Sequence, residues 1–83
     1  ANHIFSYIEL DEQHAIIEVA VPEDWQGRSI GELDIRRKYG VNILGVKREN
    51  KTDVNISPET VLDADMTLLV LGENQKLKKH FRL

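Results

Sequence analysis

The sequence predicts a small α+β domain whose elements follow the order β-β-α-β-β-β-α, with two short helices packed on a sheet. Apolar residues alternate with a period of two near the N-terminus, a capped helical segment runs from Ser29 to Gly40, and the hydrophobic run MTLLVLG occupies 66–72. The 83 residues are enough for one domain. A chain of this size buries only about 60% of its unfolded surface, so a second copy or a partner would add to its stability.

Two N-terminal segments predict a β-hairpin. In Ile4–Leu10 the isoleucines and the leucine share one face, while Phe5 and Tyr7 share the other. Ala15–Val21 likewise alternates, and the polar tetrapeptide DEQH between the two segments has the length of a hairpin loop. Pro22 then ends the second strand, and PEDWQGR reads as a loop.

The next segment is punctuated as a single helix. Ser29 and Glu32 form a capping box, and Gly40 suits the left-handed residue that closes a helix. On such a helix, however, Ile35 lies out of phase with Ile30 and Leu33.

Strands and a closing helix follow. The segment VNILGVKR at 41–48 is apolar on both faces, which predicts a central strand covered on both sides. We further expect a turn at 49–53, a short strand at 54–57, a polar turn or helical crossover at 59–65, a strand at 66–72 and a short basic helix at 73–83.

Composition excludes several classes of function. The formal net charge is −3 and both signs are interspersed, which disfavours a nucleic-acid polymer or a membrane surface as partner. The chain has no cysteine, so disulfides, thiol catalysis and thiolate metal sites are excluded. No apolar run approaches the roughly 20 residues of a membrane span, and no signal peptide is apparent. We therefore expect a cytosolic domain without membrane insertion, cut from a larger protein.

Catalytic and metal-binding motifs are not found. His3, His14 and His80 lack the spacing of metal ligands, and the acidic pairs lie in turns, where Asp is common. There is no serine elbow, P-loop or dinucleotide fingerprint, so we expect neither an enzyme nor a metal site. Trp25 packs over a sheet edge or anchors a partner, and the first reading is favoured.

The region 34–43 holds the best candidate site. Arg36 can clamp a phosphate, Asn42 offers donors and an acceptor, and Ile35 and Ile43 offer surfaces for a planar base. A solvated basic helix face beside two core isoleucines is the plainer alternative. The residues alone favour that alternative.

Two runs resemble a known family. GRSIGELDIRRKYGVNILGVKRENK and ISPETVLDADMTLLVLG are similar to the C-terminal lobe of RCK proteins, the TrkA-C domain, and most similar to gating subunits of Ktr potassium uptake systems of the KtrA and KtrC type. The hairpin and the closing helix fit the same family, so the resemblance covers residues 1–83. It implies a cytoplasmic regulator at the inner face of the membrane, which forms a ring beneath a membrane potassium transporter subunit. These residues would be its second lobe, without the N-terminal Rossmann lobe.

The resemblance also implies a ligand. In Ktr gating subunits two C-lobes pair about a two-fold axis and bind cyclic di-AMP, itself two-fold symmetric, at the dimer interface. The matching positions here are Ile30, Asp34, Ile35, Arg36, Asn42, Ile43 and Pro58. By this resemblance Arg36 meets the phosphates, Asn42 bonds near phosphate or base, the apolar members pack on adenine, and Asp34 orients the arginine or contacts the base.

The resemblance changes the reading of the helix as well. Leu33 would anchor it to the sheet, whereas Ile35 and Arg36 would turn toward the two-fold partner. Two other hypotheses stay open: a structural dimerisation module without a ligand, and a sensor of another nucleotide or of a divalent cation at the acidic turns.

Overall fold

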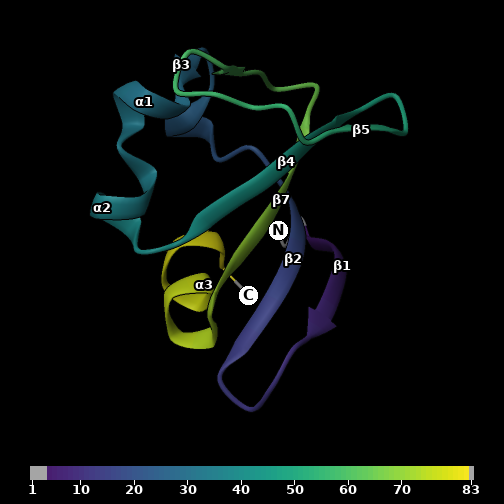
Figure 1. Cartoon of the computed structure of the whole chain (residues 1–83), viewed down its shortest axis with the longest axis vertical. Helices are drawn as coiled ribbons and strands as arrows, with labels where there is room; N and C mark the ends of the chain where they lie inside the picture. Colours follow the sequence, from purple (N-terminus) through teal and green to yellow (C-terminus); the bar gives the residue numbers. More distant parts are fainter. Residues whose placement is uncertain (1–3, 83) are drawn as a thin grey trace.

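A computed structural model describes residues 4–82 and confirms the α+β class (Figure 1). A five-stranded antiparallel sheet has the order β1-β2-β7-β4-β5. Its strands are β1 (Ile4–Glu9), β2 (His14–Ala20), β7 (Thr67–Glu73), β4 (Asn42–Arg48) and β5 (Lys51–Asp53). A two-stranded ribbon joins β3 (Arg28–Ser29) to β6 (Val61–Leu62). The helices are a short 3₁₀ turn (Glu23–Trp25), α1 (Ile30–Leu33), α2 (Ile35–Tyr39) and α3 (Asn74–Phe81).

One hydrophobic core lies between the sheet and the helices. Alternate residues of β2 and β7 point into it, as the period-two pattern predicted, and α3 contributes two more side chains. The inward residues of these three elements are Ala15, Ile17, Val19, Leu68, Val70, Leu77 and Phe81. Trp25 is only 2% exposed and packs against the rings of Tyr39 and Phe81, with ring centroids 4.9 and 5.6 Å away. Trp25 was expected to pack over a sheet edge; it is instead buried against side chains of α2 and α3.

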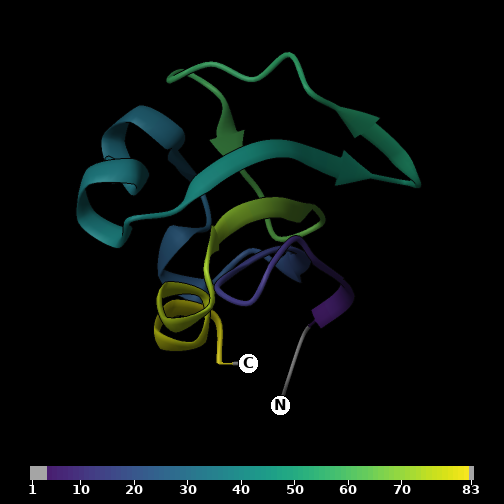
Figure 2. The ribbon, with the colours of Figure 1, turned by 60° about the horizontal axis from the view of Figure 1, so that its bottom comes forward.

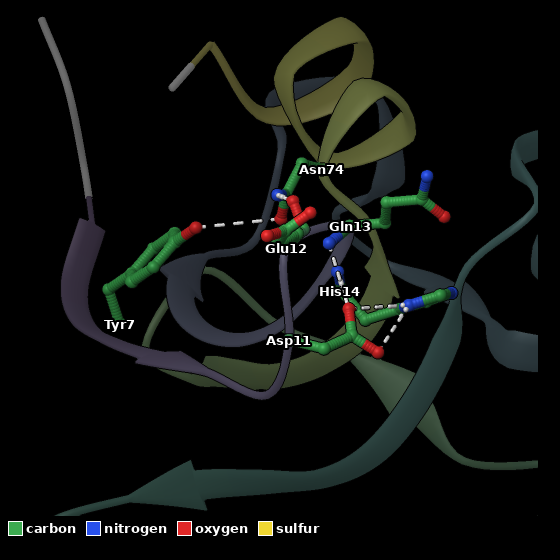
Figure 3. A network of polar contacts seen from close by, with 6 residues as sticks. All are labelled: Tyr7, Asp11, Glu12, Gln13, His14 and Asn74. Atoms are coloured by element: carbon green, nitrogen blue, oxygen red, sulfur yellow. Dashed lines mark hydrogen bonds and ion pairs between the residues drawn. The ribbon is translucent and has the colours of Figure 1, made fainter.

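The β1–β2 hairpin is closed by a polar network at its tip (Figure 3). The carboxylate of Asp11 accepts the backbone N–H groups of Gln13 and His14, both at 2.8 Å, and also contacts the His14 ring at 2.9 Å. The bond from Gln13, together with the His14 ring, lowers the pKa of Asp11. Asn74, the first residue of α3, donates its backbone N–H to Gln13 O at 2.7 Å and its amide to Glu12 O at 3.2 Å. The hairpin tip is thereby fixed to the start of α3.

The predicted single helix is wrong, because it divides at Asp34. Its outer limits are correct: the capping box of Ser29 and Glu32 is formed, and Gly40 closes the second helix with a φ of 69°. Between them Asp34 has a left-handed backbone, with φ and ψ both 50°. This break rotates the second helix, and Ile35 becomes a core residue that is only 3% exposed. Ile35 was expected to turn toward the two-fold partner; its side chain instead packs in the core of its own domain.

The predicted strand at 54–57 is also wrong, because strand pairing begins earlier. Glu49 and Asn50 both have positive φ, as the two central residues of a tight hairpin turn require, so Arg48 pairs directly with Lys51. The strand ends at Asp53, whose side chain accepts the backbone N–H of Asn55 at 2.9 Å. Figure 2 shows the segment after β5 running back across β4 toward α1.

The strand β4 is less enclosed than predicted. It pairs with β7 on one side and with the three-residue β5 on the other, and a bulge shifts its register between Ile43 and Gly45. The inserted residue, Leu44, is 38% exposed. A Cβ at Gly45 would lie 2.9 Å from the carbonyl oxygen of Asp53, so glycine lets β5 approach here. The apolar residues on both faces of this segment are therefore explained by a bulge and not by cover on both sides. The central strand of the sheet is β7.

Protonation of His80 should destabilise the domain. The His80 ring packs edge-on against Tyr39, with centroids 5.0 Å apart, and burial together with Lys79 and Lys76 lowers the pKa of His80. The unfolded state therefore binds a proton more readily than the folded state. We expect the free energy of unfolding to fall as the pH drops from about 6.5, the ordinary histidine value, to the lower folded pKa, and to level off below it. Urea unfolding of wild type and His80→Gln across this range measures the difference.

A His14→Gln variant is the control for this measurement, because His14 lies in the hairpin beside the start of α3, whereas His80 lies near the end of that helix, so the variant should leave the His80 contribution intact. Equal pH dependence in wild type and His80→Gln would contradict the prediction.

The left-handed conformation of Asp34 should be measurable in stability. Asp34→Ala and Asp34→Gly both remove the side-chain ion pair with Arg37, but only alanine opposes a positive φ. We expect Asp34→Ala to be less stable than Asp34→Gly by roughly 1 kcal/mol in urea unfolding. Arg37→Ala removes the exposed ion pair alone and should change stability by less than about 1 kcal/mol. Equal stability of the alanine and glycine variants would disprove the constraint.

Candidate functional site

A hollow of about 260 Å³ opens where the two short helices meet the start of β4 and the segment before β6. Six of the seven positions predicted from the resemblance line it. They are Ile30, Ile35, Arg36, Asn42, Ile43 and Pro58. These positions are distant in sequence, and the fold brings them to one place on the surface.

Each wall of the hollow has a local cause. The capping box starts α1 at Ile30, and the break at Asp34 sets the start of α2 so that Ile35 and Arg36 face the same hollow. The opposite wall is held by a backbone hydrogen bond from Gly31 N to Pro58 O, 2.8 Å long. A Cβ at Gly31 would lie 2.9 Å from the Cβ of Pro58, so glycine permits this close approach.

Asp34, the seventh predicted position, does not line the hollow. Its carboxylate pairs with Arg37, so the expectation that Asp34 orients Arg36 is not met in this structure, whereas contact of Asp34 with a base stays a prediction. Asp34 instead contributes through its backbone, which separates the two helices. We therefore assign it a positioning role.

The hollow combines an apolar floor with polar groups at its rim. Ile35 is buried and Ile30 and Ile43 are half-buried, whereas Arg36 and Asn42 are exposed. Within residues 4–82, no carboxylate forms an ion pair with Arg36, in contrast to Arg37. A free guanidinium beside apolar surface is suited to an anion that carries a flat apolar group.

Sequence reasoning missed three lining residues: Val41, Ile56 and Ser57. Val41 precedes Asn42 and is fully buried, so its sequence pattern indicated only a core residue. Ile56 and Ser57 were predicted in a strand, whereas they lie in the segment that crosses β4 toward α1 (Figure 2). Their proximity to Pro58 in sequence was the one available signal.

The acidic turn at 63–65 has a structural partner. Arg48 contacts Asp63 at 2.9 Å and Asp65 at 3.1 Å, which joins the end of β4 to the turn before β7, and the bond to Asp65 raises the pKa of Arg48. Among residues 4–82, no three His, Cys, Asp or Glu side chains are grouped to hold a metal ion. His3 lies outside the described residues.

A second hollow, of about 660 Å³, lies between the end of β2, the 3₁₀ turn and the end of α3. Its lining includes Glu23, Asp24 and His80, and no residue singled out by the resemblance.

The helices that the structure describes are all too short or too polar to cross a membrane.

Comparison with known proteins identifies the family of this chain. Residues 15–83 match the TrkA-C domain. The chain is 33% identical to Ktr system potassium uptake protein C of Bacillus subtilis (strain 168) over 72 residues, which are 87% of this chain and 33% of that protein. It is 26% identical to Ktr system potassium uptake protein A of the same organism over 78 residues, 94% of this chain and 35% of that protein. The chain thus spans about a third of the length of these curated relatives.

A solved structure is similar over most of both chains. It is the RCK C domain of the potassium transport protein KtrA in complex with cyclic diadenosine monophosphate, with a TM-score of 0.75 and 32% identity, covering 83% of this chain and 81% of that one. The sequence match and the fold therefore agree, and the predicted resemblance is confirmed. The chain belongs to the TrkA-C domain family.

Proposed function

We propose that this domain is a regulatory ligand-binding unit of a potassium transport system and that it binds cyclic di-AMP between two copies of itself. The observation that carries the proposal is the convergence of six predicted positions on one hollow. The RCK C domain of KtrA, which is 32% identical, was solved with this ligand.

The size of the hollow favours a shared site. Ligand pockets usually enclose about 300–1,000 Å³. The 260 Å³ hollow of one copy is open to solvent on one side and is small for a ligand with two adenines and two phosphates. Two copies facing each other about a two-fold axis would enclose twice that space and present the same groups to each half of a symmetric ligand.

The chemistry of the rim assigns a role to each group. Arg36 would donate hydrogen bonds to a phosphate, and Asn42 would bond to the phosphate or to an adenine edge. Ile30, Ile43 and Pro58 would pack on the adenine face. Ile35 closes the floor of the hollow, and its burial assigns it to shape more than to direct contact.

Regulation would follow from the position of the site between copies. A ligand that binds one arrangement of two lobes more tightly shifts the population toward that arrangement. In a longer protein, with a Rossmann lobe and a membrane potassium transporter subunit as partner, this shift would alter the transporter at the cytoplasmic face. The proposed domain acts as a sensor and not as an enzyme.

Arg36→Ala should weaken binding of cyclic di-AMP in isothermal titration calorimetry. A hydrogen bond to a charged group is worth about 1.5–3 kcal/mol, so we expect an affinity loss of roughly tenfold to hundredfold. Arg37→Ala is the matched control, because Arg37 is the next residue, is exposed and pairs with Asp34 outside the hollow. It should leave the affinity close to wild type.

Three outcomes would contradict the proposal or its assignment of Arg36. Absence of both heat and thermal shift with wild type at tens of micromolar cyclic di-AMP, roughly the range expected of a specific site, would leave a structural dimerisation module. Equal binding of AMP or of a divalent cation would indicate another ligand class. An affinity loss in Arg37→Ala equal to that in Arg36→Ala would place the phosphate contact elsewhere.

A further inference from the structure

The strand β1 leaves one edge of the sheet open. It pairs only with β2, and no described strand lies on its other side (Figure 1). Edge strands are usually protected by lysine, proline or a strong bulge. The segment IFSYIE contains no lysine or proline, its one charge is Glu9, and its bulge is confined to the first residues, between Ile4 and Ser6.

Large apolar side chains are exposed on both faces of this edge. Phe5 and Tyr7 are 61% and 49% exposed, and Ile8 and Leu10 are 55% and 51% exposed. The helix α3 packs on β2 and β7, so its body does not cover β1. The Tyr7 hydroxyl reaches Asn74 Oδ1 at 3.5 Å, which holds the ring near the start of α3 (Figure 3). A surface of this kind is typical of an association site.

The alternation of hydrogen bonds along β1 determines which of its backbone N–H and C=O groups point away from β2. Leu10 N donates to His14 O at 2.9 Å, so the backbone N–H of Leu10 points toward β2, whereas His14 N donates to the Asp11 side chain. Because the bonding direction alternates along an antiparallel ladder, the backbone groups of Ile8 also point toward β2, opposite Ile16. The N–H and C=O groups of Tyr7 and Glu9 therefore point to the open edge.

We propose that β1 of a second copy pairs with β1 in the antiparallel direction, with Tyr7 opposite Tyr7 on a two-fold axis. This register lets the two Tyr7 residues exchange both backbone hydrogen bonds and places Glu9 opposite Phe5. The only charge of each strand thus meets an aromatic residue instead of its own copy, and Ile8 lies beside Ser6 of the second copy. A second copy is the occupant that this self-complementary pattern fits.

This contact is separate from the ligand site. The hollow is lined by residues from Ile30 to Pro58, whereas β1 lies before Ala15, where the family match begins. The proposal therefore neither requires cyclic di-AMP nor depends on Arg36.

Disulfide trapping tests the register directly, because the chain has no cysteine of its own. In the proposed pair the two Tyr7 Cα atoms are about 5.5 Å apart, within disulfide range. We expect Tyr7→Cys to give a covalent dimer under mild oxidation on non-reducing gels. In Leu10→Cys the two cysteines would be about 20 Å apart and should not cross-link. The exposed Val61→Cys controls for random collision.

Charge exchange tests the same contact without a covalent bond. Tyr7→Lys and Tyr7→Glu each place like charges on the two-fold axis, and each should raise the dissociation constant of this association by about tenfold or more in sedimentation velocity. An equal mixture of the two variants should restore association, and circular dichroism confirms that each is folded. Failure of Tyr7→Cys to cross-link, cross-linking of Val61→Cys to the same extent, or unchanged association in both charge variants would overturn the proposal. Calorimetry of Tyr7→Lys with cyclic di-AMP reports the ligand site independently.

Discussion

The left-handed backbone of Asp34 is the constraint on which the hollow beside the two short helices depends. In a continuous helix from Ser29 to Gly40, the side chain of Ile35 would lie out of phase with those of Ile30 and Leu33. The break at Asp34 reorients the second helix, so that Ile35 enters the core and Arg36 reaches the hollow. Aspartate is among the few residues other than glycine that adopt this conformation readily. Its carboxylate also joins Arg37, which keeps that cation away from the site.

Two glycines allow backbone segments near the hollow to approach each other closely. Gly31 admits Pro58 on one side, and Gly45 admits the carbonyl of Asp53 on the other. The segment that connects these contacts has no regular structure of its own at 54–57. It is held instead by hydrogen bonds to α1 and by the turn at Asp53. These hydrogen bonds hold the wall that Pro58 contributes against α1.

Sequence reasoning predicted the outer limits of the elements better than their interruptions. Ser29 and Gly40 were recognised because caps have a residue signature, whereas a left-handed aspartate inside a helical segment has none. The out-of-phase Ile35 was the visible sign of the break, although we interpreted it as a partner contact. Likewise, the hairpin turn at Glu49 and Asn50 was placed too broadly, since glutamate rarely marks positive φ. For the candidate site, the resemblance supplied positions that only the fold brings together, and the left-handed backbone of Asp34 is visible only in the folded domain.

Ile35 belongs to the core and to the floor of the hollow at once. A change in its size alters both the packing that keeps the domain folded and the depth of the hollow. Under the proposed function, adaptation to a different ligand is therefore restricted at this position, since most variants would first lose stability. Substitution costs less stability at the exposed positions Arg36, Asn42 and Pro58. Within this architecture, binding preference can diverge by changes at the rim while the floor stays the same.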